Sequence, residues 1–317
     1  MAKLPPLLEQ AARTEVPSLT DYLINVGKVR NLYKHPDFPG QLLIVARNTL
    51  TIFDFVLPCL LQGHLMPSKT QPSFNAVLDW QAQFPDIPAG RALAIKELEL
   101  FNYEFIFRMH LGGSVWQEYE ETGTVAGQEL PKGLTKWQKL SKPIFTPSTK
   151  RPDGHDQNIP TWQFFDETRR TGARQTVNML MGLYEAFYAY AAHHDILILD
   201  TKFEAGRNIV ADEVLTPDSS RFTTEEDFRA AERERRDPIF LDKQPVRDWG
   251  AKIETPFGVT GLKSLDPENS EHCAFVHSLT VPPEIIQQTQ DRYEEIFRRF
   301  AGMNASQYQH HYMGLAS

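Results

Sequence analysis

Short runs of apolar residues separated by turn residues dominate the first hundred positions. Leu42–Ala46, Leu50–Leu57 and Ala92–Ile95 each have the length and β-prone composition of a strand. Proline, aspartate and glycine mark turn material at residues 35–40, directly before the first of these runs. We therefore expect a small, mostly antiparallel first lobe.

Helical spacing appears further along the chain. From Thr176, apolar residues recur at the period of a core helix that ends near His193–His194, and they continue directly into the strand Ile196–Leu199. A second amphipathic helix is predicted from Pro282–Pro283 to Gly302, because proline favours the first helical turn and glycine the end. We expect the tail beyond Gly302 to be loosely held. A capping box beginning at Thr224 predicts a charged helix to Arg236 with a solvated face.

Charged residues cluster where the Ile196–Leu199 strand emerges from its apolar run. Side chains alternate along a strand, so Asp200, Lys202 and Glu204 share one face. A second short strand at 208–211 leads into Asp212 and Glu213, and a hairpin would bring four carboxylates and a lysine to one sheet edge.

Such a cluster is electrostatically costly, because like charges repel and partial burial removes water. We expect it to be favourable only if a cation or a phosphate-bearing ligand completes it, and Mg²⁺ prefers carboxylate oxygens and substrate phosphates. The neighbouring turn at 217–221 adds small hydroxyls and Arg221, which suit an anion. The alternative is a solvated hairpin whose acids face water.

Composition narrows the class of protein. With 317 residues, 41% of them hydrophobic, the chain can bury one large core or two lobes. Its net charge of −8 disfavours nucleic-acid binding, and no apolar run is long enough to span a bilayer. The first residues lack the apolar core of a signal peptide, and only two cysteines occur. We expect a soluble enzyme in a reducing cytoplasm.

Three other segments carry candidate chemistry. Gly27–Arg30 places a lysine beside a glycine turn that could cover phosphates, although the chain has neither a P-loop nor a dinucleotide-binding motif. The loop at 146–156 combines hydroxyls, lysine and acid, as anion-binding loops do, or forms simple turns. Glu104, Arg108 and Ser114 surround Gly112–Gly113, where the alternative is a hairpin with one exposed ion pair.

Several strings, taken in order, resemble the SAICAR synthetase family between about Gly27 and Gly302. The most specific are Gly-Ser-Val-Trp-Gln-Glu-Tyr (113–119), Leu-Pro-Lys-Gly-Leu (130–134), Pro-Ile-Phe-Thr-Pro-Ser-Thr-Lys (143–150) and Gly-His-Asp (154–156). Asp-Thr-Lys-Phe-Glu (200–204), Asp-Glu-Val-Leu-Thr-Pro-Asp-Ser-Ser-Arg-Phe (212–222) and Asp-Lys-Gln-Pro-Val-Arg-Asp-Trp (242–249) complete the set.

The resemblance implies a two-lobed α+β fold, related to ATP-grasp and kinase-like enzymes, with the nucleotide site between the lobes. Residues 1–97 would form the nucleotide-covering β lobe, and residues 98–317 the lobe with the metal and substrate site. The implied activity joins carboxyaminoimidazole ribonucleotide (CAIR) to L-aspartate through an acyl phosphate, with ATP and Mg²⁺, in purine biosynthesis. The expected assembly is a monomer or a homodimer.

The resemblance also implies roles for individual residues. Catalytic roles fall to Lys202, Asp200 and Lys150, and metal binding falls to Glu204, Asp212 and Asp156. ATP binding falls to Lys28, Arg30, Lys96 and Glu99. Substrate binding falls to Glu104, Arg108, Ser114, Asp218, Ser219, Ser220, Arg221, Lys243 and Arg247.

The first lobe departs from the family pattern. Asn48–Asp54 keeps only Phe53 and Asp54 of a usual Asp-Arg-Ile-Ser-Ala-Phe-Asp, and Gly63-His64-Leu65 stands for Gly-Lys-Gly, with Lys69 as a partial substitute. Asn31 replaces an acid, and Arg108-Met109-His110 replaces Arg-Gly-Tyr. Two alternatives therefore stay open: a paralogue that ligates another amine or carboxylate, and a catalytically silent nucleotide-binding protein.

Overall fold

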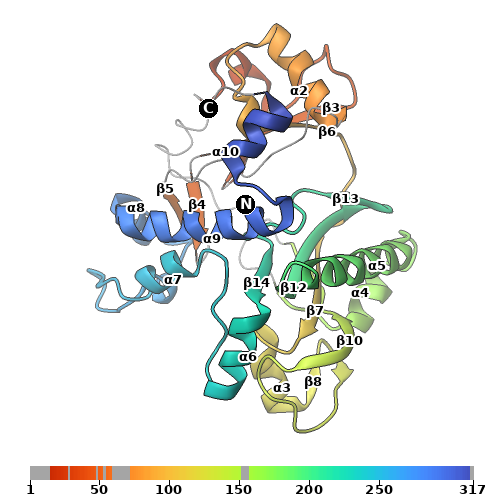
Figure 1. Cartoon of the computed structure of the whole chain (residues 1–317). Coiled ribbons are helices and arrows are strands. Elements are labelled where there is room, and N and C mark those ends of the chain that lie inside the picture. Colours follow the sequence, from red (N-terminus) through yellow and green to blue (C-terminus); the bar gives the residue numbers. More distant parts are fainter. Residues whose placement is uncertain are drawn as a thin grey trace. The chain divides into compact units, whose positions relative to one another are not determined.

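The computed structural model describes residues 15–27, 29–47, 49–52, 55–58, 72–150 and 157–314 (Figure 1). Within them the chain mixes helices and sheets and forms two compact units. One unit is Leu98–Asp242, and the other combines residues 2–97 with Lys243–Ser317. The chain after Lys243 thus groups with the first 97 residues, whereas the sequence assigned it to the lobe that begins at residue 98.

An antiparallel sheet is the framework of the Leu98–Asp242 unit. Its order is β10 (Lys139–Phe145), β7 (Tyr103–His110), β12 (Ile196–Gly206) and β13 (Ile209–Ala211). Two short strands extend it, because β11 (Ser148–Thr149) pairs with β7 and β14 (Ser220–Thr224) pairs with β12. The predicted strand and hairpin after residue 196 are confirmed, and β12 continues through the charged residues to Gly206.

Helices and apolar side chains cover one face of this sheet. The helix α5 (Ala173–Ala192) packs along β12, as Figure 1 shows, and confirms the predicted core helix. Its Tyr184 hydroxyl accepts from the Met109 amide at 3.0 Å and donates to the Ile198 carbonyl at 2.8 Å, which joins the helix to β7 and β12. Phe105, Phe107 and Phe203 are completely buried.

Three further helices and a small hairpin complete the unit: α3 (Ser114–Thr122), β8 (Thr124–Val125), β9 (Gln128–Glu129), α4 (Thr161–Glu167) and α6 (Glu225–Glu234). The predicted helix start at Thr224 is confirmed, because its hydroxyl accepts from the Asp227 amide at 3.0 Å.

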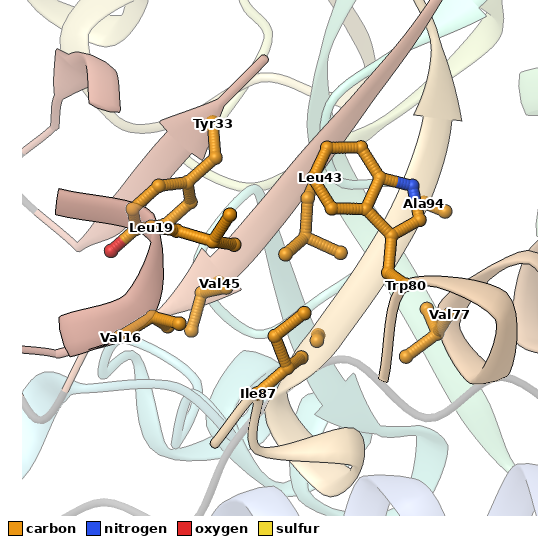
Figure 2. Packing of buried hydrophobic residues seen from close by; sticks show 10 residues of the cluster. Val16, Leu19, Tyr33, Leu43, Val45, Val77, Trp80, Ile87 and Ala94 are labelled. Carbon is orange, nitrogen blue, oxygen red and sulfur yellow. The ribbon is translucent and has the colours of Figure 1, made fainter. Parts of the chain in front are cut away.

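The second unit contains an antiparallel sheet in the order β1 (Leu23–Val26), β2 (Arg30–Tyr33), β3 (Gln41–Ala46) and β6 (Ala92–Lys96). The helix α2 (Pro72–Gln83) and the 3₁₀ turns η1 (Pro17–Tyr22) and η2 (Ala89–Arg91) accompany it. Figure 2 shows how Tyr33, Leu43, Trp80 and their apolar neighbours form its core. The predicted strands at 42–46 and 92–95 are confirmed.

The single strand expected over Leu50–Leu57 was wrong in extent. Two antiparallel strands, β4 (Thr49–Ile52) and β5 (Phe55–Pro58), take its place. Residues 50–57 are mostly apolar on both sides of the reversal, so their pattern does not reveal the turn. Contacts of β4 with α7 and of β5 with α8 tie this hairpin to the C-terminal helices.

The C-terminal segment is helical: α7 (Gln244–Gly250), η3 (Leu262–Ser264), α8 (Ser270–Ser278), α9 (Pro283–Ala301), α10 (Ala305–Tyr308) and the π-helix η4 (Gln309–Met313). The helix predicted up to Gly302 is confirmed, and Gly302 ends it in the left-handed conformation. The loosely held tail is not observed, because a capping box at Asn304 starts α10 and Tyr308 packs on Phe297 at 5.4 Å. Among the described residues, no helix has the length and apolar character needed to cross a membrane.

Candidate functional site

Three strands bring two arginines onto one aspartate. Asp200 on β12 lies opposite Arg108 of β7 and opposite Arg221 of β14. Its Oδ2 accepts from Arg108 Nη1 at 2.5 Å and also from Arg221 Nη1. A β-bulge helps to aim these groups, because Leu199 is an extra residue between the pairs Ile198↔Phe222 and Asp200↔Arg221.

Arg108 is almost completely buried, so its surroundings must satisfy its donors. Its Nε donates to the Thr146 hydroxyl at 3.0 Å and its Nη2 to the Ser114 hydroxyl at 3.4 Å. Burial lowers the pKa of Arg108, and the charge of Asp200 opposes that shift. Arginine stays charged in proteins, so this buried cation depends on its carboxylate partner. The alternative interpretation of this segment, a hairpin with one exposed ion pair, is therefore wrong for Arg108.

Two further ion pairs extend the charged face along β12. Lys202 Nζ lies 2.8 Å from Glu104 Oε1, and Lys150 pairs with Glu204. Burial by itself would lower the pKa of Lys202, but Glu104, Glu204 and Glu213 outweigh it and raise that pKa. Lys202 is thus a permanent cation near neutral pH.

The acids of this face have protein partners, which corrects the expectation that only an external cation or phosphate makes the cluster favourable. Ion pairs join three acids, Glu104, Asp200 and Glu204, to four bases, Arg108, Lys150, Lys202 and Arg221. Glu213 also acts on Lys202 and adds a fourth negative charge, so the cluster is close to neutral. The exposed part of the Arg221 guanidinium is where this face favours an anion.

The turn before β14 uses its hydroxyls to hold itself together. The Thr216 amide donates to the Ser219 hydroxyl at 3.1 Å, and the Ser219 carbonyl accepts from the Lys202 amide at 2.9 Å. The Ser220 and Thr201 hydroxyls lie 2.7 Å apart. Thr201 faces away from Asp200 and Lys202 by strand alternation, so the Ser220 hydroxyl lies on the opposite face. Asp218 follows Thr216 in the same turn, and its amide donates to the Thr216 hydroxyl at 3.3 Å.

Two of the three predicted metal ligands, Glu204 and Asp212, lie on or directly after the hairpin of β12 and β13. Glu204 pairs with Ala211, and Asp212 follows immediately with a left-handed φ of 58°. Glu213 accepts a hydrogen bond from the Thr216 hydroxyl. The described residues contain no group of three or more histidine, cysteine or acidic side chains arranged to hold a metal ion. Asp156 lies outside the described residues.

The other predicted residues are spread over both units. Glu99 lies in the Leu98–Asp242 unit, between β6 and β7, whereas Arg30, Lys96, Lys243 and Arg247 belong to the second unit. Lys28, Asn48, the retained Phe53 and Asp54, the departures at 63–69 and Gly154 lie outside the described residues.

Asn31, the neutral replacement for an acid, is completely buried on β2, where its Nδ2 donates to the Tyr33 hydroxyl at 3.2 Å.

The sequence did not indicate two residues beside the arginines. Thr146 was read only as part of a possible anion loop, and Trp137, whose ring centre lies 5.9 Å from the Arg221 guanidinium, was not singled out. Only the pairing of β10 with β7 and the turn before β10 bring them to the site.

Comparisons with known proteins agree with the strings in the sequence. The family model of SAICAR synthetase matches residues 23–259. Phosphoribosylaminoimidazole-succinocarboxamide synthases from Thermobifida fusca and Syntrophobacter fumaroxidans are 34% and 32% identical, over 94% and 91% of this chain and 96% and 95% of theirs.

Among solved structures, SAICAR synthase from Saccharomyces cerevisiae complexed with SAICAR has a TM-score of 0.68 at 28% identity, and covers 90% of this chain and 96% of its own. The family match spans most of the chain and includes every residue of the charged face described above. The chain belongs to the SAICAR synthetase family.

Proposed function

We propose that this protein is an ATP-dependent ligase that joins CAIR to L-aspartate and releases SAICAR, ADP and phosphate, as a step of purine biosynthesis. Family membership and relatives named phosphoribosylaminoimidazole-succinocarboxamide synthase support this reaction. The single observation that carries it is the network of four bases and three acids on β7, β12 and β14, with Asp200 between Arg108 and Arg221.

The reaction requires charge neutralisation more than covalent chemistry from the protein. The CAIR carboxylate attacks the γ-phosphorus of ATP, which forms a C–O–P bond and breaks the bond to the ADP oxygen. The aspartate amine then attacks the acyl carbon, releases phosphate and loses a proton as the amide forms. We assign Lys202 and Lys150 the role of offsetting charge on the carboxylate and on the transferred phosphoryl group. Because its pKa is raised, Lys202 acts as a cation rather than as a base.

Substrate binding uses the arginine end of the same face. Arg221 keeps 30% of its side chain exposed while Asp200 orients it, so its remaining donors can reach an anion. Arg108 is too deeply buried for the same task and serves chiefly to hold Asp200. We assign Glu104, Ser114, Asp218 and Ser219 to the same substrate region.

Mg²⁺ fits the hairpin that carries Glu204 and Asp212. Mg²⁺ usually takes one or two protein carboxylates and completes its shell with water and phosphate oxygens, so a large cluster of acids is not required. The pairing of Glu204 with Ala211 puts Asp212 at the adjoining position. These two residues would hold the ion, with Asp156 as a further ligand. When bound, it would neutralise charge on the ATP phosphates.

The arrangement of lobes and the residues that bind ATP and the ribose phosphate belong to the same proposal. We propose two lobes of the kind found in ATP-grasp and kinase-like enzymes, with ATP held by Lys28, Arg30, Lys96 and Glu99. Lys243 and Arg247 are assigned to the ribose phosphate of CAIR. A cytoplasmic location and a monomeric or homodimeric state stay predictions from the sequence.

A related ligase with another amine or carboxylate is the second candidate. The departures in the first lobe favour it, and Asn31 is one that the structure describes. Its buried amide is used within its own sheet, where an ionised acid would be costly. Loss of that acid removes a charge that a co-substrate could use.

One assay separates the candidates. Purified protein is incubated with ATP, Mg²⁺, CAIR and aspartate, and both ADP and SAICAR are measured. Formation of both supports the proposed reaction, and formation of ADP only with another amine or carboxylate supports the second candidate. Absence of turnover with every substrate would leave the silent nucleotide-binding alternative.

Variants test the metal assignment. Glu204→Gln and Asp212→Asn should each abolish turnover while the far-UV circular dichroism spectrum stays that of the wild type. Glu129→Gln, the same chemical change at an exposed position on β9, is the control and should stay active. Full activity of both Glu204→Gln and Asp212→Asn would contradict the metal assignment.

A further inference from the structure

Trp137 occupies an unusual place beside the charged face. It is buried and adopts a left-handed φ of 65° in the turn before β10. Main-chain hydrogen bonds hold that turn to the end of β7, since the Trp137 amide donates to the Leu111 carbonyl at 2.7 Å. The ring nitrogen Nδ1 of His110 lies 2.9 Å from the Trp137 carbonyl oxygen. A non-glycine residue at positive φ is uncommon, so the indole is held there by its surroundings.

The indole is fixed at both ends. Its Nε1 donates to Asp237 Oδ1 at 2.9 Å, and Phe240 packs edge-on against the ring at 5.1 Å. Arg221 lies near the same ring, with its guanidinium carbon 5.9 Å from the ring centre. That distance is within the range of a cation–π interaction.

Two glycines make room for this arrangement. A Cβ on Gly112 would lie 2.1 to 2.5 Å from Cε3, Cζ3 and Cδ2 of Trp137, so the indole fills the space that a side chain would need. The φ of Gly112 is not in the left-handed region, and the backbone itself therefore accepts alanine. A Cβ on Gly113 would lie 2.6 Å from Arg221 Nη1, so the arginine packs directly against the main chain.

We infer that Trp137 is a positioning residue for Arg221, and that Gly112 is required because the indole lies against it. Arg221 is then held by Asp200, by the indole and by the main chain at Gly113, which fixes the direction of its free donors. This inference rests on the proposed function, in which Arg221 binds CAIR. It adds a residue that contacts no substrate and acts through the arginine.

The expected effect is on substrate affinity. A guanidinium released from the ring binds the CAIR anion less well in the ground state and in the transition state alike, which raises KM and leaves kcat unchanged. Trp137→Ala should raise the KM for CAIR about three- to tenfold, from the usual strength of a cation–π contact. The KM for ATP should not change. A purely structural defect would instead reduce the active fraction, which lowers apparent kcat and leaves KM alone.

Gly112→Ala provides the independent test, because it displaces the indole without touching Trp137 in the sequence. It should raise the KM for CAIR in the same way. In the Trp137→Ala background, Gly112→Ala should cause no further increase, since the clashing atoms are absent. Trp137→Phe should restore much of the affinity because it keeps a ring face. Trp162→Ala, at a tryptophan that is 68% exposed, and Gly182→Ala, where a Cβ meets nothing within 4 Å, are the matched controls.

The experiment measures SAICAR formation under varied CAIR for each variant at a temperature where circular dichroism shows it folded. A selective rise in the KM for CAIR with non-additive Gly112 and Trp137 effects supports the inference. If the wild type is active but the KM for CAIR is unchanged in both Trp137→Ala and Gly112→Ala, the inference is wrong while the proposed function stands. The same holds if the effects of the two substitutions on KM are fully additive. Wild type that forms no SAICAR overturns the proposed function as well. If Trp137→Ala does not fold, the KM for CAIR is measured in Trp137→Leu and Gly112→Ala instead, and the same outcomes support or overturn the inference.

Discussion

Replacing Asp200 by asparagine should destabilise the Leu98–Asp242 unit as well as remove activity. Asp200 is the carboxylate shared by Arg108 and Arg221, and Arg108 is only 4% exposed at its side chain. The variant leaves two neighbouring guanidinium groups without a counter-charge. Arg108 cannot lose its proton and cannot reach water.

The magnitude follows from this burial. Removing one partner of a buried ion pair costs about 3–5 kcal/mol of unfolding free energy. The Asn oxygen and the hydroxyls of Thr146 and Ser114 still accept hydrogen bonds, so we expect the lower end, about 3 kcal/mol. Glu204→Gln makes the same chemical change four positions along β12, but its partner Lys150 is 40% exposed. Water can solvate that lysine, and the cost should stay below about 1 kcal/mol.

Urea unfolding followed by far-UV circular dichroism measures the difference. With an m value of about 1–3 kcal/mol/M, a loss of about 3 kcal/mol lowers the midpoint by roughly 1 M or more. The midpoint of Glu204→Gln should remain near that of the wild type. If Asp200→Asn unfolds at the same urea concentration as Glu204→Gln, the ion pair of Asp200 with the buried Arg108 does not stabilise the unit.

Three further predictions concern single interactions in the same unit. Burial lowers the pKa of His110 to about 4 from its ordinary 6.5. The contribution of the neutral ring to the unfolding free energy is therefore complete above pH 6.5 and is lost as the pH falls through 4. Urea titrations of His110→Gln and wild type should therefore differ by about 3 kcal/mol less at pH 4 than at pH 7, and a pH-independent difference would refute this. Tyr184→Phe should cost about 1–3 kcal/mol in urea unfolding because it leaves the Met109 amide unpaired, and an unchanged midpoint would refute that role. Thr224→Ala should cost about 1 kcal/mol in the same assay by removing the helix cap, and Thr224→Ser, which keeps the hydroxyl, should restore it.

Local patterns predicted the elements on which the site is built. Helical spacing identified the core helix at 173–192, and the apolar run at 196–199 identified the strand that follows it. These signals depend on neighbours within a few residues, so they survive without knowledge of the fold. The hairpin of β4 and β5 was missed because a reversal inside one short, mostly apolar run leaves that run looking like a single strand. The helical tail after Gly302 was missed because its stability comes from packing on α9.

The sequence alone was sufficient to assign the family and to place Asp200, Lys202 and Glu204 on one face, because strand alternation is a local property. Only the tertiary structure decided what balances their charge. Arg108 lies 92 residues from Asp200 and Arg221 lies 21 residues from it, and they meet through strand register and a bulge at Leu199. The cluster that seemed to need an external cation is therefore largely neutralised from within. Long-range pairing depends on the whole sheet, and so does the place of Trp137 beside Arg221.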